Sequence, residues 1–175
     1  MNSTPRRIAV ISTGGTIEKT YDEFSGVLDN QVSVLDVMLA SLTLEGVDVH
    51  RVALMNKDSL EMSDADHDRI AETACTWAEQ LDGVIVVHGT DRLAESGRRI
   101  HARPDRPDTP IVLTGAMRPY LLRNTDALQN LTEALLAVQL MPPGVYVAMH
   151  NRVLPFPHVK KDRAIGRFVT EEPTS

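Results

Sequence analysis

The chain has 175 residues, 42% of them hydrophobic and 24% charged, which suffices to bury one hydrophobic core without disulfides or a structural metal. Its formal net charge of −6 argues against a nucleic-acid-binding or membrane-surface protein, because both polyanions would repel it. The single cysteine, Cys75, excludes an internal disulfide and a cysteine-based metal cluster, and its place in a predicted helix indicates a buried, inert thiol.

The first predicted element is a strand at residues 8–12, followed by the glycine-rich run STGGTI at residues 12–17. The apolar stretch at residues 8–11 is too short for a signal-peptide core or a membrane span, so we expect a cytoplasmic protein. In isolation, the glycine-rich run would be a tight turn with two polar caps. It matches neither a phosphate loop nor a dinucleotide-binding fingerprint.

Apolar residues at helical spacing predict a helix near residues 35–42, and the next apolar run predicts a strand at residues 47–54. Ser63 and Asp66 resemble a capping box at the start of a longer helix with one apolar face. The Val/Ile-rich residues 83–88 form the third predicted strand, which leads into HGTD at residues 88–91. Taken alone, the threonine and aspartate there would be helix caps.

A short helix is predicted at residues 92–102, then a strand at residues 110–114 that leads into TGAMRP at residues 114–119. Asn124 or Thr125 is expected to cap the next helix, which precedes a last strand at residues 144–149. Pro155 and Pro157 predict a rigid loop that aims Lys161 back at the preceding strand ends.

Strands that alternate with helices predict a single α/β domain: a doubly wound, mostly parallel sheet with helices on both faces, of Rossmann or flavodoxin type. In such sheets the ligand crevice lies beyond the carboxyl ends of the strands. The polar runs found above follow those ends and would supply hydroxyls, a carboxylate, a lysine and exposed backbone N–H groups. That set of groups is typical of acyl transfer, which needs a nucleophile, an activator and oxyanion donors.

The runs TGGTI, HGTD and TGAMRP, in this order and approximate spacing, resemble the motifs of the bacterial-type L-asparaginase/glutaminase family. The resemblance extends from about residue 8 to residue 168. It implies that the whole chain, residues 1–175, is a catalytic domain of the N-terminal asparaginase type. It also implies an L-asparagine amidohydrolase with some glutaminase activity, which releases aspartate and ammonia through an acyl-enzyme without a metal or cofactor.

Carried over position by position, the resemblance assigns the catalytic roles to five residues. Thr16 resembles the nucleophile, and Tyr21 the tyrosine that helps to activate it. Thr90, Asp91 and Lys161 resemble the second polar cluster of the site, in which the aspartate also holds the α-ammonium group of the substrate. A threonine hydroxyl is a weak nucleophile until a neighbour takes or shares its proton, so such a cluster has a chemical purpose.

The resemblance also implies substrate-binding positions at Gly15, Asp58, Ser59, Gly89 and Ala116. The serine matches the residue that binds the α-carboxylate, and the alanine carbonyl would receive the leaving amide nitrogen. Where the family commonly has glutamine after this serine, the chain has Leu60.

Many members of the family carry a second, smaller C-terminal domain, and the chain stops at Ser175, so we expect a short form. The resemblance implies a homo-oligomer, a dimer or tetramer, with no nucleic-acid or membrane partner. Two other functions remain open: an amidohydrolase for another small amide or a D-amino acid, and a non-catalytic amino-acid-binding sensor.

Overall fold

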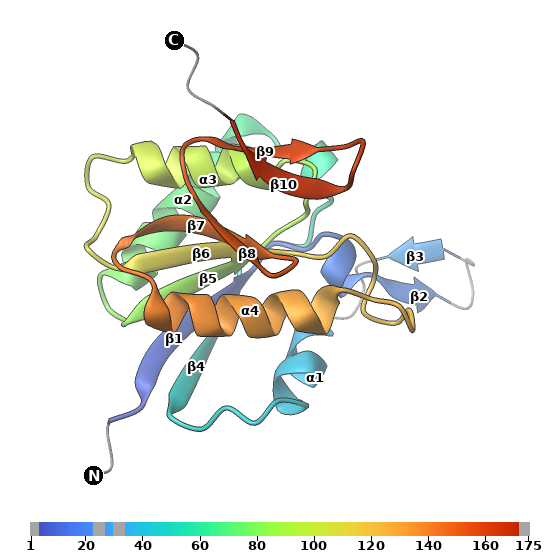
Figure 1. Cartoon of the computed structure of the whole chain (residues 1–175), viewed down its shortest axis with the longest axis horizontal. Coiled ribbons are helices and arrows are strands. Elements are labelled where there is room, and N and C mark those ends of the chain that lie inside the picture. Colours follow the sequence, from blue (N-terminus) through green and yellow to red (C-terminus); the bar gives the residue numbers. More distant parts are fainter. Residues whose placement is uncertain (1–3, 23–26, 30–33, 172–175) are drawn as a thin grey trace.

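A computed structural model describes residues 4–22, 27–29 and 34–171, and its centre is a six-stranded sheet with the order β4-β1-β5-β6-β7-β8 (Figure 1). The first five strands in this order are parallel, and β8 pairs antiparallel with β7 at the edge. The strands are β1 (Arg6–Ser12), β4 (Val47–Ala53), β5 (Gly83–Val87), β6 (Pro110–Thr114), β7 (Gly144–Met149) and β8 (Arg152–Pro155). All five predicted strands are confirmed, because Val/Ile-rich runs of this length suit strands covered on both faces.

Helices cover both faces of the sheet, as predicted (Figure 1). The helices are α1 (Leu35–Ala40), α2 (Asp64–Ala78), α3 (Leu93–Ala102) and α4 (Ala127–Leu140). One buried cluster joins α2 and α3 to the sheet, and a second joins α1 and α4 to its other face. Cys75 is buried on α2, in agreement with the expected inert thiol. Among the described helices, none has both the length and the apolar character required to span a membrane.

The predicted start of α2 is confirmed, since Ser63 is its N-cap and forms a capping box with Asp66. The predicted start of α4 is confirmed in part, since Thr125, one of the two expected caps, accepts the backbone N–H of Ala127 on its hydroxyl at 3.0 Å, but the helix has its N-cap one residue later. Its N-cap is Asp126, whose side chain does not cap the helix but accepts hydrogen bonds from the backbone N–H groups of Met117 and Arg118. Tertiary contacts of the preceding loop therefore outweigh the local capping preference at this position.

The chain after β7 contains strands that sequence patterns did not predict. Pro155 ends β8, where a rigid loop was expected, and the hairpin β9 (Val159–Asp162) with β10 (Arg167–Thr170) packs over α3. A second small hairpin joins β2 (Thr20–Asp22) to β3 (Val27–Asp29). Two 3-10 helices, η1 (Thr16–Glu18) and η2 (Ser59–Glu61), follow β1 and β4.

Gly97→Ala should destabilise the protein, although alanine favours an isolated helix by about 1 kcal/mol over glycine. A Cβ at Gly97 on α3 would lie 2.1 Å from Cζ of Phe156, a ring that is itself buried. Overpacking of this kind costs about 1–3 kcal/mol. The free energy of unfolding from urea titration measures the change, and the double variant with Phe156→Leu should recover part of the loss. A Gly97→Ala protein as stable as the wild type would contradict the close packing.

Candidate functional site

The loops after β1 and β5 meet at two glycines. Gly15 has a φ of 87°, and a Cβ there would lie 2.5 Å from Cα of Gly89. A Cβ on Gly89 would in turn lie 2.7 Å from the hydroxyl of Ser59, which is buried at the start of η2. Three of the predicted site positions are therefore in contact, although they lie far apart in the sequence.

The two threonines of the first loop have different environments. Thr13 is fully buried, and its hydroxyl donates a hydrogen bond of 3.0 Å to the carbonyl oxygen of Val87, which ties the end of β1 to β5. Thr16 begins η1 and is only partly buried. Of the two hydroxyls, the one at position 16 is therefore better placed to meet a substrate.

Lys161 on β9 joins Thr90 and Asp91. Its Nζ donates to the threonine hydroxyl at 2.8 Å and to the aspartate Oδ1 at 3.0 Å. The side chain of Lys161 is 15% exposed, whereas that of Lys160 is 54% exposed and pairs with Glu171 at 3.3 Å. Successive side chains of a strand point to opposite faces, so only one of the two lysines can reach the threonine.

The loop after β6 packs directly behind this cluster. A Cβ on Gly115 would lie 2.2 Å from the carbonyl oxygen of His88 and 3.3 Å from Cγ2 of Thr90. Ala116, the next residue, is buried. The loop after β6 therefore lies next to the cluster of Lys161, Thr90 and Asp91. This agrees with the expectation that ligand sites of such sheets lie beyond the carboxyl ends of the strands.

Asp58 supports η2 with both oxygens of its carboxylate. Its Oδ1 accepts the backbone N–H of Leu60 at 3.0 Å, and its Oδ2 accepts Nζ of Lys19 at 3.2 Å. These interactions, led by the backbone hydrogen bond, hold the pKa of Asp58 below its usual value, although burial opposes them. The Leu60 side chain is 60% exposed and is not packed in the core.

Tyr21 lies in β2, where its Cα pairs with that of Leu28. Its side chain lies outside the described part of the structure, so its predicted contact with the nucleophile stays a prediction.

A buried histidine network behind the β5 loop was not identified as a unit from the sequence. His88 Nδ1 lies 2.8 Å from the carbonyl oxygen of Gly89, and its Nε2 lies 2.9 Å from the hydroxyl of Ser96. The same hydroxyl lies 2.7 Å from Nδ1 of His67 on α2. Burial lowers the pKa of His88 to about 4 and also lowers the pKa of His67. Both rings are therefore neutral at pH 7, and the network fixes the backbone just before Thr90.

Asp126 anchors the loop after β6 in a similar way. Its carboxylate accepts the backbone N–H groups of Met117 at 3.0 Å and Arg118 at 2.9 Å, and Nδ2 of Asn130 at 2.9 Å. It also lies 2.7 Å from Nε2 of His150. Burial acts to raise the pKa of Asp126, but these hydrogen bonds outweigh it and keep the pKa below its usual value. The sequence analysis did not identify this network; a signal that could have indicated it is Asn130, a polar residue on the buried face of α4.

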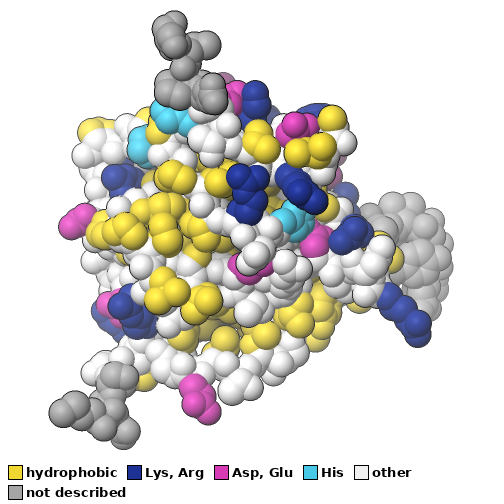
Figure 2. Space-filling view, viewed as in Figure 1, with side chains coloured by type: hydrophobic (Ala, Val, Ile, Leu, Met, Phe, Trp, Pro, Cys, Tyr) yellow, Lys and Arg dark blue, Asp and Glu magenta, His cyan; other side chains and the backbone are white. Residues whose placement is uncertain are grey.

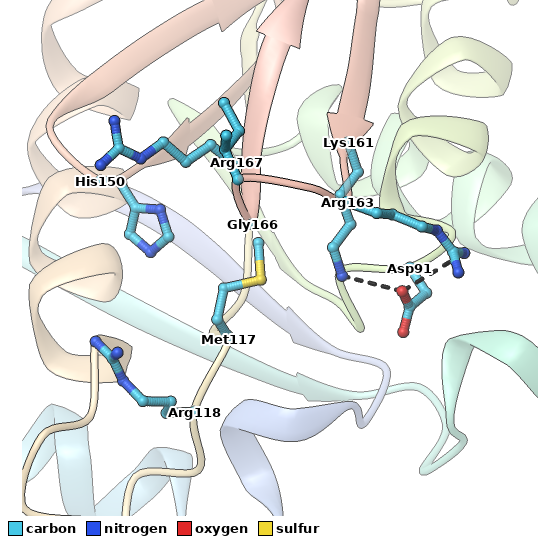
Figure 3. Close-up of a pocket in the computed structure, with 9 residues that line it drawn as sticks. Asp91, Met117, Arg118, His150, Lys161, Arg163, Gly166 and Arg167 are labelled. Carbon is cyan, nitrogen blue, oxygen red and sulfur yellow. Dashed lines mark hydrogen bonds and ion pairs between the residues drawn. The ribbon is translucent and has the colours of Figure 1, made fainter.

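A pocket of about 760 Å³ opens beside the Lys161 cluster, between the β9–β10 hairpin and the loop after β6. Figure 2 shows Lys and Arg side chains gathered around one histidine on this face. We call it the basic pocket; its charged and titratable lining residues are Asp91, Arg118, His150, Lys161, Arg163 and Arg167 (Figure 3). Neither its histidine nor its arginines were among the site residues predicted from the sequence. Within the described ranges, no group of three or more His, Cys, Asp or Glu residues could hold a metal ion.

Comparison with known proteins gives a consistent result. Residues 7–167 match the family model described as asparaginase, N-terminal. An L-asparaginase from Thermococcus kodakarensis is 30% identical over 162 residues, which cover 91% of this chain and 49% of that protein. A glutamyl-tRNA(Gln) amidotransferase component from Haloquadratum walsbyi is 34% identical over 145 residues, which cover 82% and 33% of the two chains.

Solved structures show the same likeness. The thermostable L-asparaginase from Thermococcus kodakarensis superposes with a TM-score of 0.84 at 29% identity, covering 94% of this chain and 51% of that one. A probable cytoplasmic L-asparaginase from Campylobacter jejuni gives a TM-score of 0.79 at 30% identity, with 94% and 53% covered. The chain thus spans about half the length of these asparaginases.

Stability should fall as the pH drops from about 6.5 toward 4, because the buried histidines resist protonation. The pKa of His88 is about 4 in the folded protein against 6.5 ordinarily, so the unfolded chain binds the proton first. Its contribution to stability is complete above pH 6.5 and is lost as the pH falls toward 4. The loss is up to about 1.4 kcal/mol per pH unit for each such histidine.

Urea unfolding at pH 7, 6 and 5 measures this dependence. His88→Gln should flatten it, whereas His158→Gln, at an exposed position, should leave it unchanged. Equal slopes for the wild type and His88→Gln would show that the buried ring is not the source.

Proposed function

Because the chain belongs to the asparaginase family, whose N-terminal domain model it matches over residues 7–167, we propose that it is a catalytic domain that hydrolyses the side-chain amide of L-asparagine. The observation that carries the proposal is the Lys161–Thr90 hydrogen bond, at 2.8 Å, beside the contact between Gly15 and Gly89. This arrangement supplies a positioned hydroxyl, a cation and two closely packed glycine backbones at the ends of the adjacent parallel strands β1 and β5. Weaker hydrolysis of glutamine accompanies the main reaction, because one methylene changes transition-state binding by only about 1–3 kcal/mol.

In the proposed reaction, the hydroxyl of Thr16 attacks the amide carbon and the tetrahedral intermediate forms. Backbone N–H groups near Gly15 and Thr90 stabilise the developing oxyanion, a contribution of about 3–4 kcal/mol for each well-placed donor. The C–N bond then breaks, and ammonia leaves with the proton taken from the hydroxyl. Water next hydrolyses the acyl-enzyme ester, which restores the threonine and releases aspartate.

The remaining residues have supporting roles in this proposal. Tyr21 helps to activate the nucleophile, and Lys161 with Thr90 shares and relays its proton. Ser59, on the support that Asp58 provides, binds the α-carboxylate. Asp91 already uses Oδ1 for Lys161, and we assign its Oδ2 to the α-ammonium group.

Two residues contribute to substrate binding through the protein backbone. Gly89 lets the β5 loop approach Ser59 closely, and the carbonyl oxygen of Ala116 receives the leaving amide nitrogen. Every step uses groups of the chain itself, so the proposed reaction needs no metal or cofactor. We also propose a cytoplasmic homo-oligomer, a dimer or tetramer; one structural neighbour is described as a probable cytoplasmic L-asparaginase.

Two observations favour alternatives that the experiments must separate. Leu60 is exposed beside the proposed head-group site, and a glutamyl-tRNA(Gln) amidotransferase component is among the relatives, which favours another small amide or a D-amino acid as substrate. The second alternative is a sensor, which would bind amino acids at the same proposed substrate site without hydrolysing them. Such a sensor would have no need of the lysine that contacts Thr90.

Thr16→Ala and Thr90→Val should each lower ammonia release from L-asparagine by at least about 100-fold, since each removes a hydroxyl from the acyl-transfer machinery. The assay compares L-asparagine, L-glutamine and D-asparagine at neutral pH. Thr76→Val on the exposed face of α2 serves as the matched control and should keep wild-type activity. Binding of aspartate with no ammonia release by the wild type would replace the catalytic proposal with the sensor.

Lys161→Met should also abolish most activity, while Lys161→Arg should stay well below the wild type. Arginine keeps a positive charge near Asp91 but does not give up its proton at neutral pH. Steady-state kinetics on L-asparagine separate these effects, with Lys160→Met as the control on the other face of β9. Wild-type rates in Lys161→Arg would show that only the charge is needed.

A further inference from the structure

The basic pocket collects more positive charge than its surroundings neutralise. Lys161 and Arg163 lie 3.0 Å and 3.6 Å from Oδ1 of Asp91, so these two cations share one carboxylate. Within the described residues, the guanidinium groups of Arg118 and Arg167 have no hydrogen bond or ion pair. Like charges that face one cavity repel each other, and the repulsion disappears when an anion binds between them.

The two arginines without partners lie on the same side of the pocket. In Figure 3, Arg118, His150 and Arg167 occupy one side, and Lys161, Arg163 and Asp91 occupy the other. None of the described lining residues on that side is acidic, although the buried carboxylate of Asp126 lies behind His150, 2.7 Å from its Nε2. The chain as a whole carries a formal charge of −6, so this local excess of cations runs against its general composition.

The backbone of Arg118 is held firmly in place. Its N–H donates to Oδ1 of Asp126 at 2.9 Å, and its carbonyl oxygen accepts the hydroxyl of Thr125 at 3.0 Å. The same aspartate lies 2.7 Å from Nε2 of His150, which fixes the imidazole on this side of the pocket. Arg167 comes from a third segment, β10, where it lies opposite Asp162 in the hairpin. Both arginines are exposed, so their guanidinium groups are accessible to an anion, and guanidinium groups recognise carboxylates and phosphates by paired hydrogen bonds.

The pocket also has a definite relation to the catalytic loops. Its lining includes Met117 and Arg118, the two residues that follow Ala116, together with Lys161. The proposed function assigns the carbonyl of Ala116 to the leaving amide nitrogen, so the pocket extends from the leaving-group side of the site.

We propose that the basic pocket is a subsite for an oxyanionic group, a carboxylate or phosphate, carried on the amide nitrogen of the substrate. This inference rests on the proposed function and names its substrate class: secondary amides of aspartate whose departing amine bears an anion. Chemically, the C–N bond breaks as before, but the amine leaves in place of ammonia and takes the proton from Thr16. Water then hydrolyses the same aspartyl ester.

The first test measures anion binding without catalysis. Inorganic phosphate is titrated calorimetrically into the wild type, Arg118→Gln and Arg167→Gln at low ionic strength, where salt screens the charges least. We expect each variant to weaken binding by about tenfold, the effect of one lost charge-assisted contact. Arg69→Gln, an equal charge change at an exposed position on α2, should bind phosphate like the wild type. No binding, or binding that ignores both pocket arginines, would overturn the subsite.

The second test compares β-aspartylglycine, whose amide nitrogen carries a carboxymethyl group, with L-asparagine as substrates. The ratio of their kcat/KM values should fall about tenfold in Arg118→Gln and Arg167→Gln, by loss of one such contact, and not in Arg69→Gln. If phosphate binds through the arginines while β-aspartylglycine is neither cleaved nor inhibitory, the pocket takes a free oxyanion and the substrate assignment is wrong. If phosphate binds in this way but neither amide is hydrolysed, the anion subsite stands and the proposed function fails.

Discussion

The close approach of Gly15 and Gly89 is the constraint on which the site depends. β1 and β5 are neighbours in the sheet and pair in register up to Ser12 and Val87, so their loops leave the sheet side by side. A Cβ on Gly15 would lie 2.5 Å from Cα of Gly89, a distance that real Cβ atoms essentially never show, and its φ of 87° favours glycine as well. Each glycine is followed by a threonine. The absence of side chains at the junction thus brings the hydroxyl-bearing residues of two loops to one place, where larger residues would force the loops apart.

Buried polar groups support these loops from behind. The β5 loop rests on His88, Ser96 and His67, whereas the loop after β6 rests on Asp126 and Asn130. A buried polar group that loses its partner costs about 1–3 kcal/mol, so each network tolerates few arrangements of the loop that it contacts. Rigid loops in turn hold the groups that they carry at fixed separations, which the proposed acyl transfer requires. The buried polar networks and the loops of the candidate site therefore depend on each other.

The local sequence pattern was sufficient to predict the elements of this fold that consist of uninterrupted apolar runs. It predicted the five parallel strands, the capping box at Ser63 and the meeting of polar residues at the strand ends. It missed the β9–β10 hairpin, because the strand from Val159 to Asp162 is largely charged and is held by packing on α3 rather than by its own composition. The histidine network was missed for a related reason: His67 and His88 become partners only when α2 packs against α3 and β5. Likewise, the side chain of Asp126 bonds the loop after β6 and does not cap its own helix.

Residues around a shared centre, rather than the centre itself, can explain how relatives with different described functions differ. Chains described as L-asparaginases and as components of glutamyl-tRNA(Gln) amidotransferases are both similar to this one over most of its length. Hydrophobic contacts separate substrates that differ by a methylene only weakly, by about 1–3 kcal/mol, whereas a polar site left unpaired rejects the wrong partner more strongly. Selectivity is therefore more easily set by charged groups around the reaction centre than by the centre itself. Here such groups come from the β9–β10 hairpin and the loop after β6, two of the segments that line the basic pocket.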